Sequence, residues 1–386
     1  MKIAGIIAEY NPLHRGHLWH IAETRRRTGC DYLIVCMDGH FTQRGEPALW
    51  SKWERARMAL LSGADAVFEL PALFAVRSAD AFARGGVAVL GGLGADTLCF
   101  GCETEALSAI EALASIRANE PPEVTRAVRS GLDAGKSHAR AWGEAVAATL
   151  GLPAGTVNSP NLALAAEYVR AAGELGFGME MLPVGRRGDY HSEVLGAYPS
   201  ATAVRAAFSR GETEAALACM PVPAAPDDMH PMDDMLLMTL RDMSPARLSE
   251  LPDVSEGLDS RLFRLCRTAS TREDLIEAMK CKRYTRARLS RLLTHALLGF
   301  TRALVEQYPL PPYARLIGLR EGAEPLMKAL RQRASISVVT SATALREDPV
   351  FQLECRATDI WALMHDRPAK RLPGREFTEK FVRAPA

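Results

Sequence analysis

The chain has 386 residues, of which 48% are hydrophobic and 24% are charged, and its formal net charge is +1. This composition is typical of a globular protein with room for two domains, and it excludes a disordered or fibrous chain. A protein that is basic throughout is excluded as well, so any surface for nucleic acid must be a local patch. The apolar stretches are too short for a signal peptide or a membrane span, and the eight cysteines are scattered. We therefore expect a cytoplasmic protein with reduced thiols and no membrane partner. Its CxxC pair stands alone in the sequence, so we expect no metal site.

The first half of the chain alternates short apolar runs with stretches of helical spacing. The apolar runs predict buried strands over residues 2–9, 31–37, 64–70, 95–101 and 179–184. The stretches between them predict helices over 16–29, 51–63, 78–94, 161–176 and 200–211, with two more helices within 104–150. Such alternation predicts an α/β fold built on a Rossmann-like, doubly wound parallel sheet.

The composition changes after this region. The segment "CMPVPAAPDDMHPMDD" (219–234) is rich in proline and acidic residues, which is typical of a linker. We expect a sheet-containing domain over 1–215, a linker over 216–234 and a mainly α-helical domain over 235–386. The polar segment from about residue 366 onward is expected to be loosely held.

Two histidines stand at the start of the first predicted helix, in "GIIAEYNPLHRGHLWHI" (5–21). In a doubly wound sheet, ligands bind at the carboxyl ends of the strands, beside the starts of the following helices. A helix start offers unpaired N–H groups that attract phosphate. His14 and His17 add imidazole donors that can stabilise charge on phosphate oxygens, while Gly16 permits close approach and Pro12 stiffens the turn. The alternative is that one histidine caps the helix and the other packs in the core.

A second helix start with the same chemistry lies in "PSATAVR" (199–205). Ser200 and Thr202 offer hydroxyl groups, and Arg205 offers a guanidinium group that binds phosphate. Alone, this segment is an ordinary helix start with a serine cap. Together, the two anion sites on separate helices predict a triphosphate ligand.

These segments carry a resemblance. "HRGH" is similar to the HxGH signature of the nucleotidylyltransferase (HIGH) superfamily, whose members attack the α-phosphate of ATP, and "SATAVR" is similar to its second signature. Across nearly the whole chain, blocks such as "FTQRGEPALWSKWERARMAL", "LCFGCE", "NSPNLALAAEY" and "KRYTRARLSRLL" resemble the bacterial tRNA(Met) cytidine acetate ligase family. The resemblance implies an ATP-dependent ligase that forms acetyl-adenylate. It also implies transfer of the acetyl group to N4 of the wobble cytidine of elongator tRNA(Met), which gives N4-acetylcytidine, with Mg²⁺ carried by ATP and no role for DNA.

The resemblance also implies site residues. His14 and His17 are expected to be catalytic. The residues expected to bind ATP are Ile7, Ala8, Glu9, Tyr10, Asn11, Pro12, Gly16, His20, Gly101, Asn161, Arg186, Arg187, Ser200, Thr202 and Arg205. Gln43, Arg44 and Glu46 follow the second predicted strand on the ligand side, and His191 is either a further phosphate donor or a loop residue.

The segment "KCKRYTRARLSR" (280–291) is densely basic. Such a run is often a solvated helix face, but its density and its tyrosine favour RNA. We expect it to bind tRNA, with phosphate contacts that make binding salt-dependent and with Tyr284 stacked on an unpaired base. The basic residues expected to bind tRNA are Lys280, Lys282, Arg283, Arg286, Arg288 and Arg291.

Two other functions fit parts of this pattern. One is an adenylyltransferase that acts on a phosphorylated small molecule, and the other is a non-catalytic RNA-binding protein that holds ATP. The basic segment disfavours the first, and the paired phosphate motifs disfavour the second. Acetate-dependent exchange of pyrophosphate into ATP distinguishes them, because among the three only the ligase requires acetate.

Overall fold

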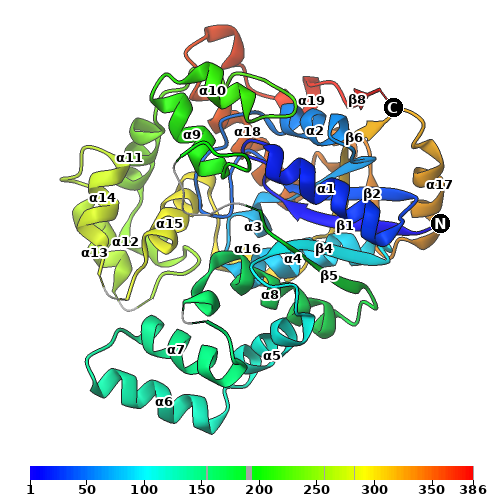
Figure 1. Ribbon diagram of the computed structural model, residues 1–386. Coiled ribbons are helices and arrows are strands. Elements are labelled where there is room, and N and C mark those ends of the chain that lie inside the picture. Colours follow the sequence, from blue (N-terminus) through cyan, green and yellow to red (C-terminus); the bar gives the residue numbers. More distant parts are fainter. Residues whose placement is uncertain (154, 188–193, 256, 282, 386) are drawn as a thin grey trace.

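The computed structural model describes residues 1–153, 155–187, 194–255, 257–281 and 283–385. Over these residues the strands form one eight-stranded sheet surrounded by helices (Figure 1). The strand order is β5-β4-β1-β2-β3-β6-β7, and β8 pairs with β6. The strands are β1 (Ile3–Ala8), β2 (Tyr32–Asp38), β3 (Ala66–Leu70), β4 (Thr97–Cys102), β5 (Glu180–Gly185), β6 (Tyr313–Arg320), β7 (Ser337–Val339) and β8 (Val382–Ala384).

The first five strands are parallel to one another. Their order, β3-β2-β1-β4-β5, reverses direction between β1 and β4, as in other doubly wound sheets. Each starts and ends within two residues of its predicted bounds. The predicted Rossmann-like fold is confirmed, and the point where the strand order reverses is where such sheets bind ligands.

Helices cover both faces of this sheet. The helices α1 (Arg15–Thr28) and α2 (Lys52–Leu61) pack on one face, and α3 (Ala72–Ala75), α4 (Ala79–Gly92) and α8 (Pro160–Leu175) pack on the other (Figure 1). The side chains of β2 alternate between the two layers: Leu33 and Val35 join the first, Ile34 and Cys36 the second. Burial on both faces explains why these strands are continuous apolar runs in the sequence.

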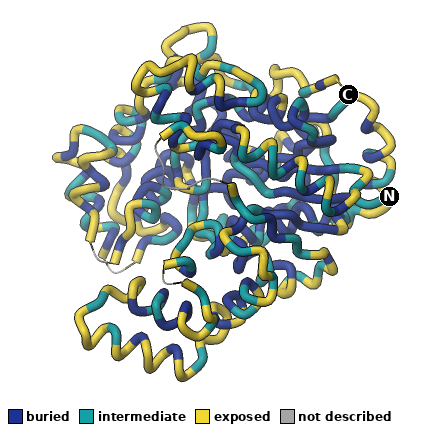
Figure 2. The backbone as a smooth tube through the Cα atoms, in the orientation of Figure 1, coloured by how far each residue is buried: buried dark blue, intermediate teal, exposed yellow. Residues whose placement is uncertain are grey.

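Three helices, not the two expected, lie between β4 and α8: α5 (Leu107–Ala118), α6 (Pro122–Asp133) and α7 (His138–Leu150). The difference arises at Pro121 and Pro122, since proline ends one helix and suits the first turn of the next. A short 3₁₀ turn, η1 (Thr156–Asn158), follows α7. The α6–α7 hairpin projects from the body of the protein and is largely exposed (Figures 1 and 2).

The C-terminal half is mainly helical, as expected, but it also contributes three strands to the sheet. β6 pairs antiparallel with β3, and β7 and β8 both pair with β6, so residues 313–384 extend the same sheet. The remaining helices are α9 (Ala201–Ser209), α10 (Thr213–Ala218), α11 (Asp233–Asp242), α12 (Pro245–Ser249), α13 (Leu258–Leu265), α14 (Arg272–Met279), α15 (Arg286–Leu298), α16 (Arg302–Gln307), α17 (Glu324–Arg333), η2 (Ala342–Leu345), α18 (Pro349–Leu363), η3 (Pro368–Lys370) and α19 (Arg375–Thr378). Within the described ranges, none of the helices has the length and apolar character needed to cross a membrane.

The segment after residue 366 is also held more firmly than expected. It ends in β8, and Glu376 on α19 is only 3% exposed. Ion pairs join Glu376 to Lys52 on α2 and to Arg315 on β6, each at 2.5 Å. Charged residues far apart in the sequence therefore anchor the end of the chain to the sheet.

Candidate functional site

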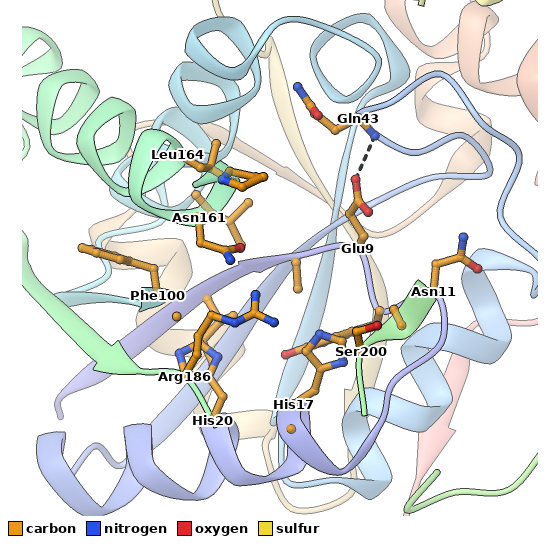
Figure 3. A pocket seen from close by; sticks show the side chains of 18 of the residues that line it. Glu9, Asn11, His17, His20, Gln43, Phe100, Asn161, Leu164, Arg186 and Ser200 are labelled. Carbon is orange, nitrogen blue, oxygen red and sulfur yellow. Dashed lines mark hydrogen bonds between the residues drawn. The ribbon is translucent and has the colours of Figure 1, made fainter. Parts of the chain in front are cut away.

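A cavity of about 410 Å³ opens at the carboxyl ends of β1 and β4, where the strand order reverses. Its wall is formed by the ends of β1, β4 and β5, the starts of α1, α8 and α9, and the loop of residues 42–46 after β2 (Figure 3). This volume is within the range of small-molecule sites. The position agrees with the site expected for a doubly wound sheet.

His14 and His17 cap the start of α1 in a reciprocal way. The His14 Nδ1 accepts a hydrogen bond from the Gly16 N–H at 3.1 Å, and the His17 Nδ1 accepts one from the His14 N–H at 3.3 Å. Their rings stack with centroids 3.8 Å apart. The capping role and the ligand-facing role are thus compatible, because each ring uses one nitrogen for the backbone and lines the cavity.

The hydrogen bonds also determine the protonation of both rings. Since each Nδ1 is an acceptor, the proton of the neutral imidazole lies on Nε2. Burial, with help from the charges of Arg186 and Arg205, lowers the pKa of His14 to about 3. Burial and the neighbouring His14 also lower the pKa of His17 well below its usual value. At neutral pH the pair therefore offers two neutral N–H donors rather than two cations.

The second predicted phosphate site, at the start of α9, meets the first. The Ser200 hydroxyl oxygen caps α9 by accepting the Ala203 N–H at 3.0 Å. Arg205, one turn later, donates to the Asn11 carbonyl oxygen at 2.7 Å and to the Thr202 hydroxyl at 3.3 Å. The guanidinium group thus connects α9 to the loop that precedes α1. The two helix starts line one cavity and present N–H, hydroxyl and guanidinium groups to it.

A third part of the wall carries Gly101 and Asn161. A Cβ on Gly101 would be 3.6 Å from the Arg186 side chain, which is an ordinary contact, so protein packing does not require glycine there. The Asn161 Nδ2 donates to the Glu103 Oε1 at 2.7 Å, which fixes the orientation of its amide. Bare backbone and an oriented amide suit the flat edge of a nucleoside.

The structure brings together nearly all residues that the sequence placed at the site. His14, His17 and every residue predicted to bind ATP except Pro12 line the cavity. Pro12 is buried in the turn, and its predicted place in the cavity wall is not confirmed. His191 lies outside the described residues.

Sequence reasoning missed the apolar part of the wall. It is formed by side chains that resemble ordinary core residues in the sequence: Trp19, Phe82, Phe100, Leu164 and Tyr168. Arg187 packs over the Trp19 ring, with its guanidinium carbon 4.8 Å from the centroid. Trp19 was detectable in principle, since it lies two residues after the second histidine of the motif. The other four side chains line the cavity only because of the way in which α4, β4 and α8 pack.

His20 yields a prediction on acid stability. Burial and, to a smaller extent, the charge of Arg186 lower its pKa to about 4. An unfolded histidine has a pKa of about 6.5, so below that pH the unfolded chain binds protons that the folded chain does not. We expect the free energy of unfolding to fall as the pH falls, with His20 alone contributing about 2 kcal/mol between about pH 7 and pH 5. Urea unfolding of the wild type and His20→Gln at both pH values checks this; equal losses in the two proteins would contradict it.

The basic segment of residues 280–291 lies at the junction of α14 and α15. Lys280 and Arg283 are exposed there, whereas Lys282 lies outside the described residues. Arg286 forms a bidentate ion pair with Glu273 on α14. The segment contains no acid of its own, but acidic residues of the preceding helix offset part of its charge.

Tyr284 corrects a prediction. Its side chain is only 7% exposed, its hydroxyl donates to the Ser255 carbonyl oxygen at 3.3 Å, and the guanidinium of Arg288 packs over its ring. The expected stacking on an unpaired base is therefore wrong, because the ring is already covered. Arg288 also donates to the Asp253 carbonyl oxygen at 2.8 Å, and Arg291 is half-buried. The accessible charge of this segment thus lies mainly at its beginning.

One group of three carboxylates among the described residues has the spacing of a metal site: Glu69, Glu354 and Glu376. These side chains are buried, with Glu69 on β3 itself, and they do not line the cavity. The Lys52 ammonium contacts Glu69 and Glu376, and Arg315 pairs with Glu69 at 2.9 Å. Protein cations therefore balance these carboxylates, which indicates an anchor for the fold rather than an ion site.

Comparisons with known proteins agree with this geometry. A family profile described as HIGH Nucleotidyl Transferase matches residues 1–375. The tRNA(Met) cytidine acetate ligase of Acetivibrio thermocellus is 32% identical over 99% of this chain and 100% of its own length. The enzyme of the same name from Syntrophomonas wolfei is 33% identical over 98% of each chain. The crystal structure of Thermotoga maritima TmcAL bound with alpha-thio ATP is similar with a TM-score of 0.86 and 28% identity, and the match covers 100% of both chains. The chain therefore belongs to the tRNA(Met) cytidine acetate ligase family of HIGH nucleotidyl transferases.

Proposed function

We propose that this protein activates acetate with ATP to form acetyl-adenylate and transfers the acetyl group to N4 of the wobble cytidine of elongator tRNA(Met). The proposal rests above all on the hydrogen bond from Arg205 to the Asn11 carbonyl oxygen. This bond joins the two phosphate-binding helix starts, so that both line one cavity. The names of the curated relatives and the ATP analogue bound by the T. maritima neighbour support it.

In this proposal ATP lies with its adenosine against Gly101 and Asn161 and with its phosphates between the two helix starts. An acetate oxygen attacks the α-phosphorus in line with the departing pyrophosphate. The Nε2–H groups of His14 and His17 donate to phosphate oxygens as negative charge develops, which lowers the barrier without a covalent step to the protein. Pyrophosphate departs toward Arg205 and the start of α9. Mg²⁺ carried by ATP would offset part of the charge of the phosphate oxygens.

The second step joins the acetyl group to the cytidine amine. The N4 atom attacks the carbonyl carbon of acetyl-adenylate, and AMP leaves. A mixed anhydride hydrolyses readily, so the cavity has to exclude water until the base arrives. Much of the rate enhancement then comes from holding the amine against the carbonyl group.

The test of this function is direct. Protein, ATP, acetate and total tRNA are incubated, and the nucleosides of the tRNA are analysed for N4-acetylcytidine. The modified nucleoside should form only when ATP and acetate are both present, and pyrophosphate exchange into ATP should require acetate. Exchange that proceeds without acetate would favour an adenylyltransferase that acts on another acceptor. The absence of exchange would favour a non-catalytic binding protein.

The exposed start of the basic segment is proposed to hold tRNA phosphates. Arg283→Glu should weaken tRNA binding at low salt. It should also reduce the slope of the logarithm of the binding constant against the logarithm of the salt concentration by about one, because one phosphate contact is lost. Filter binding at several salt concentrations measures this. Arg331→Glu, at an exposed arginine of α17, is the matched control, and α17 lies on the opposite side of the molecule from α14 and α15 (Figure 1). Equal effects of the two variants would contradict a local tRNA surface.

A further inference from the structure

The side of the cavity opposite the histidines carries a carboxylate. Glu9, the residue after β1, is among those expected to contact ATP, but its side chain points toward Gln43, on the side opposite His17 and His20 (Figure 3). The Glu9 Oε1 accepts a hydrogen bond from the Gln43 N–H at 2.9 Å. The Gln43 side-chain amide in turn donates to the Arg77 carbonyl oxygen at 2.8 Å. The carboxylate is therefore held in place on the wall of the cavity.

A buried ion pair fixes the backbone of Glu9 as well. Arg55 is fully buried, and its Nη1 donates to the Glu9 carbonyl oxygen at 2.5 Å and to the Asp38 Oδ1 at 2.7 Å. The next residue, Tyr10, has φ of 49°, in the left-handed region that side chains other than glycine rarely adopt. Such a conformation persists only where the surrounding structure enforces it, and it is concentrated at functional sites. The position of the Glu9 side chain is thus imposed by the fold.

The chemistry of this wall selects among the three reactants. Acetate and the phosphates of ATP are anions, which a carboxylate repels. The exocyclic amine of cytosine is a hydrogen-bond donor, which a carboxylate accepts. We propose that Glu9 binds the N4 amine of the acceptor cytidine and serves as the general base of the acetyl transfer. This inference rests on the proposed function and adds a residue for its second step.

The N4 lone pair attacks the carbonyl carbon of acetyl-adenylate and forms the N–C bond. The bond between that carbon and the phosphate oxygen breaks, and AMP leaves with its electron pair. The proton lost from N4 passes to the Glu9 carboxylate. A neutral amide and AMP result, and no oxidant or further reactant is required.

The loop beside Glu9 leads to the proposed tRNA surface. The Gly45 carbonyl oxygen accepts hydrogen bonds from Thr294 on α15 at 2.7 Å and from Arg272 at 3.2 Å. Gly45 has φ of +72°, and a Cβ there would lie 2.8 Å from the Arg291 Cα. The loop of residues 42–46 is therefore packed against the helix that continues the basic segment. The Glu9 side of the cavity and the proposed tRNA surface are thus joined by one loop.

The decisive variant is Glu9→Gln. The glutamine oxygen can still accept the hydrogen bond from Gln43, so the wall keeps its shape, but an amide is not a base. Two rates are compared in the same preparation: acetate-dependent pyrophosphate exchange into ATP, and formation of N4-acetylcytidine in tRNA. We expect the rate of transfer relative to exchange to fall about 100-fold, as a fall in kcat with little change in KM for tRNA. Trapping of the adenylate by hydroxylamine, which needs no protein base, should follow the exchange rate.

The matched control is Glu306→Gln, the same change at an exposed position of α16. It should leave both rates at the wild-type level. The inference is overturned if Glu9→Gln transfers acetyl as the wild type does, which would leave Glu9 only a structural role. It is also overturned if exchange and transfer fall together, which would place Glu9 in ATP or magnesium binding. If the wild type itself makes no N4-acetylcytidine, the proposed function fails, and this inference fails with it.

Discussion

Replacing His17 by alanine is expected to lower acetate-dependent pyrophosphate exchange by about 10²–10³-fold, the usual effect of removing one donor to a developing oxyanion. The His17 Nε2–H is available for this role because its Nδ1 already accepts the His14 N–H. His14→Ala should have a similar effect on exchange. It should also destabilise the protein by about 1 kcal/mol, because the Gly16 N–H loses its cap. Exchange of labelled pyrophosphate into ATP measures the first effect, and urea unfolding measures the second.

Further variants separate catalysis from capping. His14→Asn restores a capping oxygen but not the imidazole donor, so it should recover stability and not exchange. His138→Ala, at an exposed position of α7, should leave exchange at the wild-type rate. Because the two rings stack, the double variant should lose less than the product of the single losses. Affinity for tRNA that fell along with exchange would contradict the separation between the histidine pair and the basic segment.

Local patterns made most of the sheet predictable. The first five strands are apolar runs followed by helices with clear starts, and both signals lie within a few neighbouring residues. β6 was missed although it is also largely apolar, because "YARLIGLR" contains an arginine in the middle of the run. That residue, Arg315, is placed opposite Glu69 on the neighbouring antiparallel strand and pairs with it. A buried cation can be accepted within a predicted strand only when its partner, here 246 positions away, is known.

The functional site was likewise predictable only where its signals are local in the sequence. The histidine motif and the start of α9 were recognisable because each is a local helix start with phosphate-binding chemistry. Their contact through Arg205 and Asn11 spans 194 positions and depends on the whole sheet. The error at Tyr284 has the same origin, since its burial depends on a hydrogen bond to Ser255, 29 positions away. Residue types predicted what the groups can do, and packing determined which of them remain accessible.

The anchor at the end of the chain should carry a large share of the stability. Burial, with the nearby charge of Glu69, raises the pKa of Glu354 well above its usual value, which makes Glu354 a weaker counter-ion than its two neighbours. The short ion pairs of Lys52 and Arg315 are those with Glu69 and Glu376. Glu376→Ala would leave a buried cation without its partner, which typically costs about 3–5 kcal/mol. We expect a loss of this size in the free energy of unfolding, measured by urea titration.

The matched control is Glu324→Ala, which breaks the exposed ion pair between Glu324 and Arg383, at 2.8 Å. It should cost no more than about 1 kcal/mol, because water and salt screen exposed charges. A double variant that also replaces Lys52 by methionine should recover part of the loss caused by Glu376→Ala, since it removes the unpaired cation. If Glu376→Ala cost no more than the control, the end of the chain would not be an anchor. The ion pairs around α19 would then be incidental to the stability of the sheet.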